Sequence, residues 1–180
     1  MGAGDLSAAL WQERRQLELL LFRLETQRLH VLAGNLQWLS FTASEVESVL
    51  DRLRFEALAR NVESAAVATE WGLPAQASLI ELVGGAPAGA WPEILHEHLD
   101  GLRALLVQLT DAARANEDAL RGLPPGASRG PGGDGTATLS SDAARVLGQL
   151  TTTGNIERAL AVIRRTPQPL LAQYLNGNRD

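Results

Sequence analysis

The sequence predicts an all-α protein built as an antiparallel bundle of long helices, with a flexible Gly/Pro linker and a short helical C-terminal tail. Leu and Ala dominate its apolar residues, and aromatic residues make up only 4%. Leu and Ala favour helices, whereas strands favour β-branched and aromatic side chains. Apolar residues also recur at seven-residue spacing over long segments, as they do in helices packed side by side.

The chain of 180 residues, 45% of them apolar, is long enough for one domain with a sizeable core. We expect a helical bundle over 1–121. Residues 122–137 contain six Gly and three Pro, so 122–138 is predicted to be a flexible linker. The tail, 139–180, then carries short amphipathic segments.

The first helix is predicted over about 6–41. Its core series has a strict seven-residue repeat. The residues of this series are Leu10, Leu17, Leu24, Val31 and Trp38. Because Trp38 continues the phase of the earlier residues, Gly34 is interpreted as a close-packing point inside one continuous helix.

The second helix is predicted over 43–71. Thr42 and Glu45 have the spacing of a capping box at its start, and Gly72 followed by Pro74 is a stop signal at its end. Its apolar stripe drifts in the later half onto a second face, which includes small residues. This drifting stripe contains Leu58, Val62, Ala65 and Ala66.

The third helix is predicted over 92–121, with Pro92 in its first turn, where a missing N–H costs nothing. Its seam alternates steps of four and three residues, typical of helices packed near +20°. The seam consists of Leu95, Leu99, Leu102, Leu106, Leu109, Ala113, Asn116 and Leu120. Asn116 is expected to set the register, since a polar residue on such a seam does so at some cost in stability.

The tail contains separate apolar clusters, among them Ile156, Leu160 and Ile163, and then Leu171 and Tyr174. Each is short, and isolated helices below about 12–15 residues are marginal in water. The clusters therefore either dock onto the bundle or wait for a partner, and the bundle has either three helices or a fourth one from the tail.

The formal net charge is −5, and all sixteen cationic residues are Arg. Such a surface repels phosphates, so nucleic acid is not an expected partner. Residues 43–121 hold thirteen acids and six arginines, a balance of −7, whereas 122–180 hold four acids and six arginines, a balance of +2. The acidic body and the basic tail either pair internally or are simply solvated faces.

Several function classes have no support in the sequence. No apolar stretch reaches about 18 residues, and the first residues lack the basic and apolar regions of a signal peptide, so we expect a cytoplasmic protein without membrane insertion. There is no Cys and no Lys, and no Gly-x-Ser-x-Gly or phosphate-binding glycine loop. His96 and His98 are two residues apart and point away from each other on a helix, so they do not chelate one metal. We expect no catalytic residues, no cofactor and no metal.

The segment from Leu10 to Glu25 resembles the first helix of FlgN-type flagellar export chaperones, in their Arg-, Ala- and Leu-rich actinobacterial form. Other matching segments follow in the family's order and spacing over residues 6–121. They are Gly34, Trp38–Leu39, Glu45–Val46, Glu56–Arg60, Trp71–Pro74, Ser78–Leu82 and Ala115–Leu120. The tail beyond 122 departs from the family pattern.

The resemblance implies a cytoplasmic chaperone that binds the terminal helices of the hook–filament junction proteins FlgK and FlgL. Such a chaperone keeps its clients competent for type III export during flagellum assembly. Family tails also carry a tyrosine implicated at the export gate, and Tyr174 is the only tyrosine here. It therefore becomes a candidate for the same role.

A client helix is expected to lie in a groove, anchored by residues that the internal seam does not use. The predicted partner-binding residues are Leu58, Val62, Ala65, Ala66, Ile156, Leu160, Ile163 and Tyr174. Two alternatives remain: a self-associating helical scaffold that forms a homodimer, and an enzyme whose site is not recognised.

Overall fold

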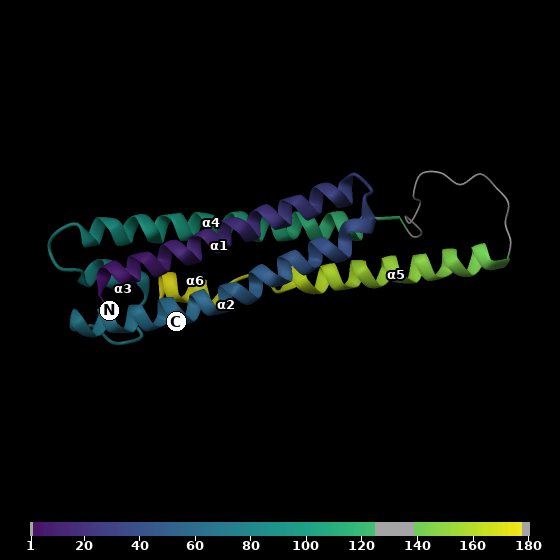
Figure 1. Cartoon of the computed structure of the whole chain (residues 1–180). Coiled ribbons are helices and arrows are strands. Elements are labelled where there is room, and N and C mark those ends of the chain that lie inside the picture. Colours follow the sequence, from purple (N-terminus) through teal and green to yellow (C-terminus); the bar gives the residue numbers. More distant parts are fainter. Residues whose placement is uncertain (1, 125–138, 178–180) are drawn as a thin grey trace.

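The computed structural model describes residues 2–124 and 139–177, and over these residues it contains helices and no strands (Figure 1). Three long helices precede the undescribed segment and one follows it. The elements are α1 (Ala3–Leu32), the short 3-10 helix η1 (Leu36–Trp38), α2 (Leu39–Glu70), α3 (Leu79–Gly85), α4 (Trp91–Arg121), α5 (Leu139–Arg164) and α6 (Pro169–Asn176). The prediction of an all-α fold is confirmed.

The long helices alternate in direction and form an antiparallel bundle (Figure 1). Both α1 and α5 pack against α2 and α4, so α1 and α5 are diagonal to each other. The tail therefore supplies the fourth helix of the bundle. Its second helix, α6, continues along the bundle and packs against α3 and α4. The N-terminal part of α5 extends past the end of the other helices (Figure 1).

The predicted seams form most of the core. Leu10, Leu17, Leu24 and Val31 are buried on α1. On α4 the buried seam residues are Leu95, Leu99, Leu102, Leu109, Ala113, Asn116 and Leu120. The side-chain amide of Asn116 donates a hydrogen bond to the carbonyl of Leu24, which ties α4 to α1 at one register. Leu106 is only partly buried, because its neighbour Leu105 turns toward the core instead.

The first helix ends nine residues before the predicted position, and this boundary was wrong. Gly34 has a φ of 74°, in the left-handed region. The amides of Gly34 and Asn35 bond back to the carbonyls of Val31 and His30, which is the Schellman arrangement that closes a helix. The phase that placed Trp38 in the core assumed an unbroken helix, and Trp38 is in fact 51% exposed.

The second helix begins at Leu39 rather than at residue 43. Thr42 lies inside it, where its hydroxyl donates to the carbonyl of Leu39, so the predicted cap does not form. A capping box is present instead at Ser78 and Glu81, at the start of α3. The predicted stop at Gly72 is confirmed, because this glycine has a φ of 73° and closes α2 as Gly34 closes α1.

The tail was predicted as short segments, but α5 is one helix of 26 residues and α6 has 8. Ala159, Val162 and Ile163 are buried on α5, so tertiary packing stabilises a helix whose separate clusters are individually weak. The predicted linker lies almost entirely outside the described residues, which resume at Leu139. No helix of the described chain is both long and apolar enough to cross a membrane.

Candidate functional site

A cleft of about 830 Å³ opens between the middle of α2 and the C-terminal helix α6. Its remaining walls are the connector after α2 and the first residues of α3. The lining residues are Ala57, Arg60, Asn61, Ser64, Ala75, Gln76, Ala77, Ser78, Ile80, Glu81, Leu170, Gln173, Tyr174, Asn176 and Gly177. Its volume is within the range of pockets that hold ligands or anchoring side chains.

A buried ion pair lies at the base of the cleft. The guanidinium of Arg60 donates two hydrogen bonds to the carboxylate of Glu13, at 2.8 and 3.0 Å, from its Nε and Nη2 atoms. Both side chains are only 3% exposed. A third guanidinium nitrogen, Nη1, donates to Asn61 at 3.0 Å. The pair joins α1 to α2, and its two-pronged geometry holds the guanidinium plane in one orientation.

Tyr174 of α6 rests on this guanidinium. The Arg60 Cζ atom lies 4.0 Å from the centre of the tyrosine ring, a cation–π contact. The phenol oxygen lies 3.1 Å from the hydroxyl of Ser64. Burial raises the pKa of Tyr174 to about 12, because the charged phenolate loses its water, although the Ser64 hydrogen bond opposes the shift. Tyr174 therefore docks α6 as a neutral side chain.

Two further polar contacts position the walls of the cleft. The Arg103 Nε atom on α4 donates to the Asn176 side chain at 2.8 Å, which fixes the end of α6. The backbone amide and hydroxyl of Ser78 both donate to Glu81 at 2.7 Å. The serine hydroxyl is the larger cause of the lowered pKa of Glu81, followed by the serine amide. The first turn of α3 is thereby capped at the edge of the cleft.

The rim of the cleft is apolar and faces solvent. Leu170 at the start of α6 is 77% exposed and Ile80 of α3 is 43% exposed. The rim is therefore a set of aliphatic side chains around a polar floor.

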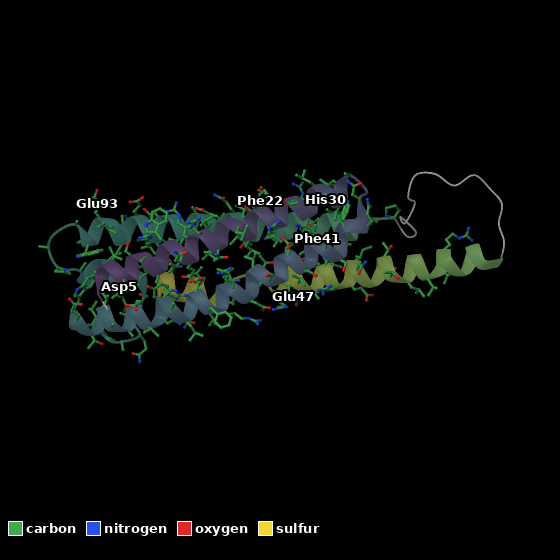
Figure 2. All side chains as sticks on the ribbon, viewed as in Figure 1. Asp5, Phe22, His30, Phe41, Glu47 and Glu93 are labelled. Atoms are coloured by element: carbon green, nitrogen blue, oxygen red, sulfur yellow. The ribbon has the colours of Figure 1, made fainter. Side chains whose placement is uncertain are left out.

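Ion pairs between the acidic body and the basic tail attach α5 to the bundle. Glu47, which lies where α2 faces α5 (Figure 2), accepts hydrogen bonds from Arg158 and Arg165, both at 3.1 Å. These bonds, with that from Arg158 the largest cause, lower the pKa of the Glu47 carboxyl. Arg164 makes a further pair with Glu117 of α4 at 3.3 Å. The hypothesis of internal charge pairing is thus confirmed for these tail arginines.

The structure divides the predicted partner-binding residues between two surfaces. Leu58 and Val62 are 62% and 52% exposed on α2, and Ala65 and Ala66 are partly exposed. The tail residues point the other way. Ile163 is buried, and Ile156, Leu160 and Tyr174 are partly buried against the core. The groove expected to be open for a visiting helix is therefore largely filled by the protein's own tail.

Sequence reasoning missed the charged pair beneath the cleft and the exposed Leu170 and Ile80 on its rim. A signal for the pair was present. Glu13 falls three residues after Leu10 and four before Leu17, on the core face of the first helix. Arg60 likewise falls seven residues after the buried Leu53. Opposite charges on two facing apolar stripes are typical of an interhelical ion pair.

The histidines offer no chelating arrangement in the described structure. His98 is buried, with its Nε2 atom 2.9 Å from the Ser7 hydroxyl, whereas the His96 side chain is 60% exposed and near Asp100. Across residues 2–124 and 139–177, no group of three or more acidic, histidine or cysteine side chains is placed to hold a metal ion.

Neither known protein-family models, nor curated proteins, nor solved structures contain a significant match to this chain.

Proposed function

We propose that this protein is a cytoplasmic flagellar export chaperone that binds the terminal helices of hook-associated proteins of the FlgK and FlgL type. The observation that carries the proposal is the cleft between α2 and α6, with exposed aliphatic residues around it. An amphipathic client helix presents apolar side chains three, four and seven residues apart. A helix lying over the cleft would bury such side chains against Leu170 and Ile80.

The cleft suits this role because the polar groups on its floor already have hydrogen-bond partners within the chain. The charges of Glu13 and Arg60 are paired, and the Tyr174 hydroxyl is bonded. A client therefore gains from covering the apolar rim without having to break a buried ion pair. Each leucine-sized anchor contributes about 1.5–3 kcal/mol before the cost of ordering the client is subtracted.

The tail takes part in this proposal as a wall of the site. Deleting residues 139–180 would remove one corner of the four-helix bundle and uncover apolar residues of α2 and α4, so loss of binding by that variant would not locate the site. The role of Tyr174 at the export gate stays a prediction, and its ring and hydroxyl are both engaged within the chain.

The test is binding of purified FlgK- and FlgL-like subunits, or of peptides of their terminal helices, measured by isothermal titration calorimetry. Leu170→Asp and Ile80→Asp should each weaken binding about tenfold or more, because truncation at an apolar anchor has costs of this size. The matched control is Val107→Asp, at a 62% exposed position of α4 that does not line the cleft. Equal binding by all three variants, or no binding by the unmodified chain, would contradict the proposal.

A further inference from the structure

The solvent-facing side of α2 carries a second apolar surface, distinct from the cleft. Phe55 is 73% exposed, Leu58 is 62% exposed and Val62 is 52% exposed. With the partly exposed Ala65, these residues form a seven-residue repeat along one side of the helix. We call the set Phe55, Leu58, Val62 and Ala65 the α2 outer stripe.

No described element covers this stripe. The buried residues of the same part of α2, such as Leu53, Ser64 and Val67, lie on the opposite side of the helix, which packs into the bundle. Scattered exposed apolar residues are ordinary on a protein surface. A contiguous helical stripe that includes a 73% exposed phenylalanine is instead typical of an interaction surface.

We propose that a second copy of this chain occupies the α2 outer stripe, with the two α2 helices antiparallel about a twofold axis. The sizes of the side chains fit this arrangement. When Leu58 faces Val62 of the partner subunit, Phe55 faces Ala65 of the partner subunit, and the axis repeats both contacts. A large residue thus meets a small one at each end, while the small side chains of Ala59 and Ala66 beside the stripe allow the helices to approach closely.

The charges beside the stripe fit the same alignment. Arg52 precedes the stripe by one turn, and Glu63 and Glu70 lie on the same flank of the helix farther along. In an antiparallel pair, Arg52 falls between Glu63 and Glu70 of the partner subunit, within about 3–8 Å along the axis at 1.5 Å per residue. In a parallel pair, Arg52 of one copy and Glu63 and Glu70 of the other would lie on opposite flanks, so the charges favour the antiparallel arrangement.

These three side chains are available for such contacts. None of them makes an ion pair within the described part of the chain, and Arg52 and Glu70 are exposed while Glu63 is partly exposed. The second copy thus offers Glu63 a cation that its own chain does not. The stripe is short compared with standard interfaces, so the dimer is expected to dissociate reversibly on dilution.

The experiment is sedimentation equilibrium of the full chain over a range of concentrations, without any client, so its outcome is independent of the proposed chaperone activity. The unmodified chain should approach twice its 19.3 kDa mass. Phe55→Asp and Arg52→Glu should each weaken dimerisation about tenfold or more. Combining Arg52→Glu with Glu63→Arg and Glu70→Arg should restore it, because the charges are then exchanged. Arg114→Glu, an exposed control on α4, should have no effect.

Three outcomes would overturn the proposal. The first is a chain that stays monomeric at all accessible concentrations. The second is a dimer that is unaffected by Phe55→Asp, which would place the interface on another face. The third is a monomer whose client binding is abolished by Phe55→Asp, which would assign the stripe to a client helix. Circular dichroism of each variant verifies that the helices are retained.

Discussion

Replacing Arg60 by methionine tests the ion pair beneath the cleft. The change leaves the Glu13 carboxylate 3% exposed and without the two guanidinium hydrogen bonds of 2.8 and 3.0 Å. An uncompensated buried charge of this kind costs about 3–5 kcal/mol. Because small proteins are stable by only about 5–15 kcal/mol, Arg60→Met should remove a large part of the total stability.

The assay is urea unfolding followed by far-UV circular dichroism. The double variant with Glu13→Leu and Arg60→Met should recover most of the loss, since an apolar pair leaves no buried charge unpaired. The control is Arg54→Met, which breaks the 3.0 Å ion pair with Asp51. The side chains of Arg54 and Asp51 are 68% and 54% exposed. That pair should contribute no more than about 1 kcal/mol. Equal losses for Arg60→Met and Arg54→Met, or no recovery in the double variant, would refute the reasoning.

Three further predictions concern the tail and the helix ends. Tyr174 is the only tyrosine, so spectrophotometric titration should give a pKa of about 12 instead of its ordinary 10.0. The contribution of the neutral phenol to the free energy of unfolding should be complete below pH 10 and be lost as the pH rises toward 12. A midpoint near 10 would show that α6 is not docked. Glu47→Gln should speed amide hydrogen exchange in α5, because the contact of Glu47 with Arg158 requires the carboxylate. Lowering the pH until Glu47 is protonated should have the same effect. Unchanged exchange would mean that packing alone holds α5. Gly34→Ala should cost about 1 kcal/mol in thermal unfolding because its φ is 74°, whereas Gly154→Ala, inside α5 with open space around it, should be neutral or stabilising.

Local patterns predicted the elements, but not every helix end. The α4 seam was predictable because its residues repeat along an uninterrupted helix, and its helix begins within one residue of the expected position. The same reasoning failed at Trp38, since a helical repeat does not keep its phase where the helix ends, as α1 does at Leu32. Gly34 is compatible with either a close helix contact or a left-handed cap, and only the backbone bonds around it distinguish the two.

The candidate site was less predictable than the fold, because it is assembled from distant parts of the chain. Leu58 was identified correctly as a residue outside the internal seam, as its exposure confirms. Ile163 was assigned to the same surface on similar grounds, yet it is buried in the core. Whether a tail cluster faces inward or outward depends on how α5 is rotated against α2 and α4, which the cluster itself does not encode.

The sequence by itself determined that this chain is helical, where the apolar seams run and that an acidic body is joined to a basic tail. Each of these follows from composition, period or charge, which are local properties. Only the tertiary structure decided that the tail completes the bundle, that Glu13 and Arg60 meet, and that Tyr174 packs on their pair. Those outcomes depend on residues such as Glu13 and Arg60, 47 positions apart, reaching the same place, and no local pattern specifies that distance in space.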